Sequence, residues 1–138
     1  MYKRQDKRVG SKALILENSK RLGVKPKFIL EENIISTLNT KNLRSFEKPN
    51  RLLIGGCDKK TKLEIINTLA QGMSIGDIIV IPIIDIQTIK DLKEELEDKN
   101  FKTNLNLIQT YKSLSIAEGM RLEPNNPIFI LKGEKKFK

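Results

Sequence analysis

Residues 51–58, R-L-L-I-G-G-C-D, constrain the fold of this chain more than any other stretch. A short run of Leu and Ile followed directly by two glycines is typical of a buried parallel strand that turns sharply at its carboxyl end. The amphipathic segment 60–73 comes next, so the stretch predicts a strand–turn–helix unit. Ligands of an open α/β sheet bind at this edge, which makes Gly55 and Gly56 the first candidates for a binding site.

Apolar runs and amphipathic segments alternate along the rest of the chain and predict an α/β fold. The predicted helices cover residues 11–22, 34–46, 60–73 and 86–99. The predicted strands cover residues 27–30, 51–54, 78–84, 102–111 and 128–131. Three strand–helix alternations predict a parallel sheet. The last two strands have no helix between them, so the final strand is predicted to be antiparallel.

Length and composition favour one domain with a hydrophobic core, because 38% of the 138 residues are apolar. No stretch approaches the roughly 20 apolar residues of a membrane-spanning helix, and the basic amino terminus has no apolar signal segment. We therefore expect no membrane partner and a cytoplasmic location. The chain has no histidine and one cysteine, which excludes Ser-His-Asp chemistry, histidine-based metal sites and an internal disulfide framework.

The formal net charge of +9 raises the question of a nucleic-acid partner. Lysines and arginines are spread along the chain instead of forming blocks, and few aromatic side chains are present for base stacking. This pattern favours a solvated basic surface over a nucleic-acid interface. A basic rim that concentrates a small polyanionic substrate is an alternative use of the same charge.

Several segments resemble one enzyme family in their order and spacing. They are E-N-S-K-R-L-G-V at 17–24, L-L-I-G-G at 52–56, L-A-Q-G-M-S-I-G-D-I-I-V-I at 69–81 and N-N-P-I-F-I-L-K-G-E at 125–134. Over residues 6–135 the chain resembles the decarboxylating precorrin-6B (cobalt-precorrin-6B) carbon-15 methyltransferases of cobalamin biosynthesis. The resemblance implies a Rossmann-like, class I S-adenosylmethionine-dependent methyltransferase fold with an antiparallel last strand.

The resemblance also implies an activity. Enzymes of this family transfer a methyl group from S-adenosyl-L-methionine to carbon 15 of a tetrapyrrole, the corrin precursor, and remove carbon dioxide from an acetate side chain. The methyl group is already activated on the sulfonium, so the protein mainly has to hold the reactants in line. The lack of histidine therefore does not argue against such an enzyme.

Two other classes of function stay open. One is a class I methyltransferase that acts on RNA or on another small molecule, which a basic patch around the cofactor edge would favour. The other is a non-catalytic interaction domain. The resemblance leaves the oligomeric state open, and the intact enzyme could be a monomer or a homo-oligomer.

The resemblance carries five candidate cofactor-binding residues and no catalytic residue. Asp6 matches the acidic residue that ends the second strand and binds the ribose hydroxyls, although it also fits a solvated surface carboxylate. Asn33 and Ile34 match the Asp-Ala pair beside the adenine, and Asn33 also fits a helix N-cap. Gly55 and Gly56 match two glycines that face the methyl donor, and they also fit a plain strand-to-helix turn.

Departures from the family pattern affect this site, and the I-P-I-I-D run at 81–85, where the family has N-A-V, is one of them. Cys57-Asp58-Lys59 replaces the family's Ser-Gly-Gly, and Cys57 is expected to be a small buried side chain instead of a nucleophile. No pair among the eight glycines has the G-x-G spacing of the loop that approaches the methionine part of the cofactor. We therefore expect this polypeptide alone to be an inactive fragment that binds the cofactor weakly.

The amino terminus carries a further expectation. Residues 1–5, M-Y-K-R-Q, match the end of a transposase adapter used in sequencing libraries when they are read back into codons. We expect residues 1–5 to be a sequencing scar, residues 6–135 to be the carboxyl-terminal portion of a single methyltransferase domain, and residues 136–138 to be a basic tail. The sheet would then be incomplete and lack its first two strands. Residues 27–30 would lack a strand neighbour, and the strand at 51–54 would form an edge.

Overall fold

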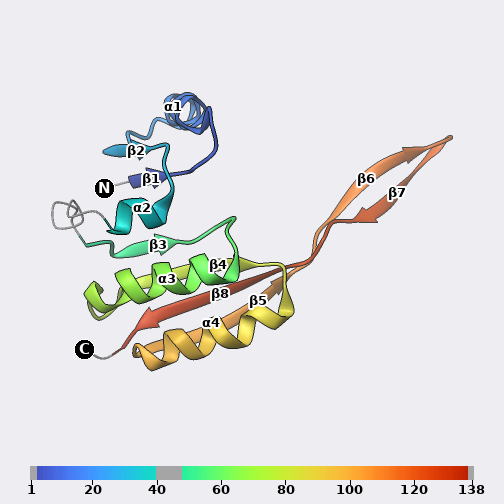
Figure 1. Ribbon diagram of the computed structural model, residues 1–138. Helices are drawn as coiled ribbons and strands as arrows, with labels where there is room; N and C mark the ends of the chain where they lie inside the picture. The colour runs from blue at the N-terminus through green and yellow to red at the C-terminus, as the bar shows by residue number, and fades with distance from the viewer. Residues whose placement is uncertain (1–2, 40–47, 137–138) are drawn as a thin grey trace. The chain divides into compact units, whose positions relative to one another are not determined.

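The computed structural model describes residues 3–39 and 48–136. The chain divides into two compact units, residues 1–47 and residues 48–138. Each unit has its own sheet and helices (Figure 1).

The first unit pairs two short parallel strands and carries two helices. Its elements are β1 (Lys3–Gln5), α1 (Ser11–Arg21), β2 (Phe28–Leu30) and α2 (Ile34–Asn39). The N–H of Asp6 extends the pairing of β1 and β2 by donating to the carbonyl of Leu30 at 3.0 Å. The Glu31 carboxylate accepts hydrogen bonds from the N–H groups of Lys12, at 2.9 Å, and Gly10, at 3.2 Å. Glu31 therefore fastens the start of α1 to the end of β2.

One expectation about this unit is wrong. Phe28–Leu30 does have a strand neighbour, because Lys3–Gln5 pairs with it in parallel. The helix predicted over 11–22 is confirmed as Ser11–Arg21. The helix predicted over 34–46 begins at Ile34 as expected, and residues 40–47 lie outside the described part of the chain.

The second unit contains a four-stranded sheet in the order β3-β4-β8-β5. Its strands are β3 (Arg51–Leu53), β4 (Ile78–Ile83), β5 (Phe101–Ile108) and β8 (Ile128–Lys135). Its helices are α3 (Lys59–Leu69), a 3-10 turn at Ala70–Gly72, and α4 (Ile86–Asp98). β3 is parallel to β4, and β8 runs antiparallel to both β4 and β5. The predicted antiparallel last strand and the predicted edge position of β3 are both confirmed.

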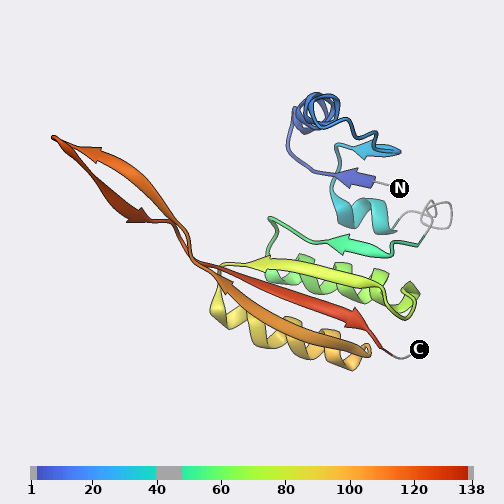
Figure 2. The ribbon, with the colours of Figure 1, turned by 180° about the vertical axis from the view of Figure 1, so that it is seen from behind.

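Helices α3 and α4 cover the same face of this sheet, as the two opposite views show (Figures 1 and 2). Burial alternates along β4, so that every second side chain packs under the helices. The largest fully buried side chains of the core are Ile66, Ile79, Ile81, Leu92, Leu96 and Leu131. At Gly133 an added Cβ would lie 3.2 Å from Leu96 and 3.3 Å from Phe101. The glycine therefore permits the close approach of α4 to β8.

A two-stranded hairpin extends from the end of β5 and returns to β8 (Figure 2). It consists of β6 (Tyr111–Ile116) and β7 (Gly119–Pro124), which pair antiparallel with each other. The sequence predicts a single strand over 102–111 and no hairpin. The strand instead ends at Ile108, and the N–H of Asn125 donates to the carbonyl of Thr110 at 2.8 Å where the hairpin begins.

Candidate functional site

A cleft of about 410 Å³ opens at the carboxyl ends of β3 and β4. The turn after β3, the end of β4 and the first turns of α3 and α4 form its walls. The lining residues are Gly56, Cys57, Asp58, Lys59, Lys62, Pro82, Ile83, Ile84, Asp85 and Thr88. This is the edge at which open α/β sheets bind their ligands, so the cleft is the candidate site.

Pro82 explains why the two strands separate here. The N–H of Ile54 donates to the carbonyl of Val80 at 3.0 Å, so the polar backbone groups of Val80 face β3. The backbone of Pro82, two residues further, faces the same way but has no N–H to donate. Pairing between β3 and β4 therefore ends, and the chain turns away at Gly55 and Gly56.

Glycine occupies the two positions of the turn for different structural reasons. Gly56 has a φ of +39°, in the left-handed region that favours glycine. Gly55 is not in that region, and a Cβ added to it would meet nothing within 4 Å. Packing therefore does not require a glycine at position 55. The missing side chain leaves the backbone open to close approach by a ligand.

Two carboxylates at the cleft cap the helices that begin there. Asp58 accepts hydrogen bonds from the backbone N–H and the hydroxyl of Thr61, both at 2.9 Å. Asp85 accepts from the hydroxyl of Thr88 at 2.6 Å and from the N–H of Gln87 at 3.0 Å. The bonds from Thr61 lower the pKa of Asp58, and those from Thr88 and Gln87 lower the pKa of Asp85. Both groups therefore stay ionised and fix the starts of α3 and α4.

Two lysines enter the cleft from α3. Lys59 forms an ion pair with Asp91 of α4. The side chain of Lys62 is buried, and its ammonium donates to the backbone carbonyl of Cys57. Cys57 itself is half-buried instead of buried as predicted. Lys62 thus holds the turn that follows β3 against the first turn of α3.

Asp6, predicted to bind ribose hydroxyls, follows β1 in the first unit. Its carboxylate accepts from the guanidinium of Arg8 at 3.0, 3.1 and 2.5 Å, and from the backbone N–H of Arg8 at 3.0 Å. These bonds lower the pKa of Asp6 from 3.8 to about 2. A ribose at this position would have to share the carboxylate with Arg8.

Replacing Arg8 with alanine is expected to raise the pKa of Asp6 from about 2 toward 3.8, because the hydrogen bonds to its ionised form are lost. A lowered pKa stabilises the folded unit at pH values above the ordinary pKa, and this contribution disappears as the pH falls toward 2. The substitution should remove that pH dependence. Carboxyl carbon NMR titration measures the pKa, with Lys7→Ala as the exposed control; an unchanged value in Arg8→Ala would contradict the assignment.

Asn33 and Ile34 lie at the start of α2. The side-chain oxygen of Asn33 accepts from the N–H of Ile35 at 3.0 Å, which is the helix-cap arrangement. Ile34 is the first residue of the helix and is half-buried. Asp6, Asn33 and Ile34 thus belong to the first unit, whereas Gly55 and Gly56 belong to the second.

Sequence reasoning did not propose Glu31, Lys62 or Asp85 as binding residues. Glu31 and Asp85 each follow a predicted strand directly, and this position could have marked them as candidates. Lys62 had no such signal, because a lysine in a predicted helix is expected to face solvent.

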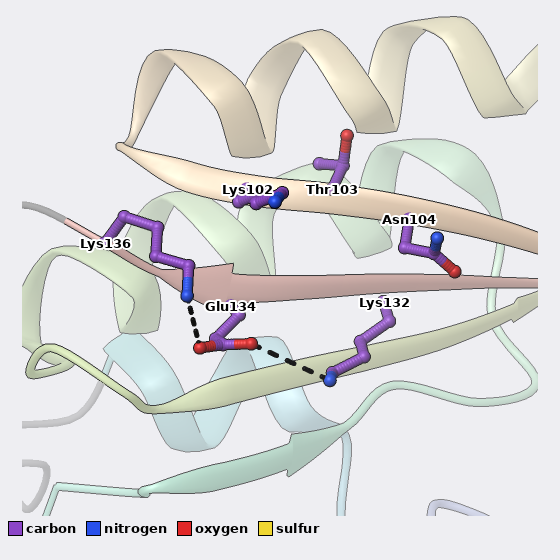
Figure 3. Close-up of a pocket in the computed structure, with 6 residues that line it drawn as sticks. All are labelled: Lys102, Thr103, Asn104, Lys132, Glu134 and Lys136. Carbon is purple, nitrogen blue, oxygen red and sulfur yellow. Dashed lines mark hydrogen bonds and ion pairs between the residues drawn. The ribbon is translucent and has the colours of Figure 1, made fainter.

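A second, smaller hollow of about 150 Å³ lies on β5 and β8 (Figure 3). Its side chains are Lys102, Thr103, Asn104, Lys132, Glu134 and Lys136. Glu134 pairs with Lys136 at 2.5 Å and Lys132 at 3.8 Å, and Lys136 is the main cause of its lowered pKa. Glu134 lies opposite Ile78, the first residue of β4. This basic cluster therefore lies near the amino end of β4, whereas the cleft lies at its carboxyl end.

The order β3-β4-β8-β5, with an antiparallel strand inserted beside β4, belongs to the class I S-adenosylmethionine-dependent methyltransferase fold. Solved structures of precorrin methyltransferases share this fold. A precorrin-6y C5,15-methyltransferase of Geobacter metallireducens superposes with a TM-score of 0.75 at 21% identity, covering 96% of this chain and 67% of that one. A precorrin 8W decarboxylase of Methanobacterium thermoautotrophicum gives 0.77 at 17% identity, covering 95% and 68%.

The particular relationship comes from sequence. A probable cobalt-precorrin-6B C(15)-methyltransferase (decarboxylating) of Saccharolobus solfataricus is 31% identical over 128 residues, which cover 88% of this chain. The chain is thus similar in sequence to that protein over most of its own length. It spans 60% of the length of that relative. No family model matches the chain.

None of the helices in residues 3–39 and 48–136 is long and apolar enough to cross a membrane. Within the same residues, no group of three His, Cys, Asp or Glu side chains could hold a metal ion.

Proposed function

We propose that this chain takes part in methyl transfer from S-adenosyl-L-methionine to carbon 15 of a precorrin-6B type tetrapyrrole, with decarboxylation of an acetate side chain. The observation that carries the proposal is the 31% identity to the Saccharolobus solfataricus relative over 128 residues. The cleft supports it, because it opens at the edge where this fold binds its ligands.

The residues of the cleft fit this chemistry in a limited way. The donor, when bound, supplies a methyl group already activated on sulfur. Gly55 directly precedes Gly56, which lines the cleft, and nothing occupies the space of a Cβ at Gly55, so its backbone is open to a ligand. Asp58 and Asp85 fix the helices that form the walls and so keep the cleft in shape. Positioning of this kind is the main contribution that a methyltransferase makes.

The chain lacks a G-x-G pair, so the 138-residue polypeptide is expected to bind the cofactor weakly and to be inactive alone. Calorimetric titration with S-adenosylhomocysteine checks the first point, and micromolar binding would contradict it. For the second point, a chimaera replaces the matched 128-residue region of the relative with the corresponding residues of this chain.

The chimaera should convert cobalt-precorrin-6B, and mass spectrometry should show one methyl group gained and one carbon dioxide lost. The isolated 138-residue chain is the control. A folded chimaera that binds the cofactor but transfers no methyl group would refute the proposed function and would favour a non-catalytic interaction domain.

An RNA methyltransferase is the other class left open by the sequence. A basic patch around the cofactor-binding end of the sheet would favour this class. The cluster of Lys102, Lys132 and Lys136 instead lies near the amino end of β4. The structure therefore gives no specific support to this alternative.

A further inference from the structure

Lys62 is a charged side chain enclosed in the candidate cleft. It occupies the first turn of α3, is only 8% exposed, and lines the cleft beside Gly56 and Asp85. Its ammonium donates to the backbone carbonyl of Cys57. In the described residues, 3–39 and 48–136, no carboxylate oxygen lies within ion-pair distance of its Nζ.

This arrangement leaves the ammonium with a neutral partner and no anionic one among the described residues. A buried charge is normally paired, because moving it out of water is only partly offset by a neutral partner. An ammonium has three N–H donors, and the carbonyl of Cys57 takes one of them.

The other charged groups of the cleft already have local partners. Asp58 is held by Thr61, and Asp85 is held by Thr88 and Gln87. Lys59 pairs with Asp91. The charge of Lys62 makes only a small contribution to the lowered pKa of Asp58, after the bonds from Thr61.

The starts of two helices also line the cleft, which carries two lysines and two aspartates. Both α3, with 11 residues, and α4, with 13 residues, begin at its wall. Helix amino termini carry partial positive charge and favour anions. Lys62 and the two helix starts favour an anionic ligand, and the capping carboxylates of Asp58 and Asp85 act against them.

We infer that Lys62 binds a carboxylate of an acidic substrate in the cleft and thereby positions the substrate against the Gly55–Gly56 turn. The inference rests on the proposed function, which supplies a polycarboxylate tetrapyrrole as substrate. Lys62 is a positioning residue. A charge-assisted hydrogen bond from its ammonium would fix one end of the substrate.

The test uses uroporphyrin III, an octacarboxylate tetrapyrrole, as the probe in a fluorescence titration of the 138-residue chain. Lys62→Met should weaken binding about tenfold or more, because methionine has nearly the same shape as lysine but cannot form the charged hydrogen bond. Lys62→Arg should retain most of the affinity. Lys60→Met is the matched control. Lys60 is exposed and lies in the same helical turn, and its substitution removes the same charge. It should alter affinity by less than about twofold.

Amide chemical shifts of the wild-type chain give a second readout that does not depend on a variant folding. Uroporphyrin III should shift the signals of Gly56, Asp58 and Thr88 around Lys62. Shifts confined to Lys102, Lys132 and Lys136 would place the probe in the second hollow and overturn the inference. Equal losses in Lys62→Met and Lys60→Met, unchanged binding in Lys62→Met, or no binding by the wild-type chain would also overturn it.

Failure of the inference is distinguishable from failure of the proposed function. A chimaera that transfers the methyl group equally well with and without Lys62→Met leaves the function standing and removes the role of Lys62. An inactive chimaera together with Lys62-dependent uroporphyrin binding refutes the proposed function and leaves the role of Lys62 standing.

Discussion

Replacing Ile81 with alanine is expected to lower the free energy of unfolding of the 138-residue chain by about 2–5 kcal/mol. Ile81 is fully buried in β4, and β4 lies between β3 and β8 under helices α3 and α4. The substitution removes apolar contacts and leaves a cavity that the surrounding strands cannot fill. Urea unfolding followed by circular dichroism measures the change, since the chain has no tryptophan.

Ile84→Ala is the matched control for this prediction. It makes the same chemical change just beyond the end of β4, at a side chain that is 73% exposed. The expected loss is below about 0.5 kcal/mol. Equal losses at the two positions would contradict the assignment of Ile81 to the packed face of the sheet.

Replacing Gly55 with valine in the chimaera is expected to lower the rate of methyl transfer by about 100-fold. The new side chain would project into space where nothing lies within 4 Å, so it would keep a ligand away from the backbone without disturbing the protein core. The unfolding midpoint should therefore stay unchanged. Single-turnover assays measure the rate, and thermal unfolding of the same sample measures the stability.

Gly119→Val in the hairpin is the control for a bulky substitution at an exposed glycine. Its added Cβ would meet only the carbonyl oxygen of Ile116, at 3.9 Å, and Gly119 lies outside the cleft. The rate should stay at the level of the unsubstituted chimaera. A normal rate in Gly55→Val would show that Gly55 only serves the turn between β3 and α3.

The long elements of the second unit could be predicted because each buries one face. The helix predicted over 86–99 is observed as Ile86–Asp98, and the strand predicted over 78–84 as Ile78–Ile83. In both, apolar residues recur with the period of the element, since one side packs in the core. The antiparallel last strand followed from the missing helix before it.

The hairpin β6–β7 could not be predicted in the same way. Its side chains are almost all exposed on both faces, so burial imposes no alternation on its residues. Strand β1 has three residues and is held to β2 by backbone pairing. Residues 1–5 were expected to be a sequencing scar, so residues 3–5 were assigned to no strand.

The candidate site likewise has features that the sequence predicted and features that it did not. Gly55 and Gly56 were found because an abrupt end of an apolar run predicts a turn at the ligand edge of a sheet. Cys57 was expected to be buried and is half-buried, and Asp6 is engaged by its neighbour Arg8. Whether a charged side chain lies in water or in a cleft depends on what packs over it.

The alternation of helices and strands, the antiparallel final strand and the turn at Gly55–Gly56 could be predicted, because they depend on residues close together in the chain. Three other features became visible only in the folded chain: the burial of Lys62, the end of β3–β4 pairing at Pro82, and the pairing of Lys3–Gln5 with β2. Burial and strand pairing join residues far apart in sequence. Local propensity carries no information about such contacts until the chain has packed.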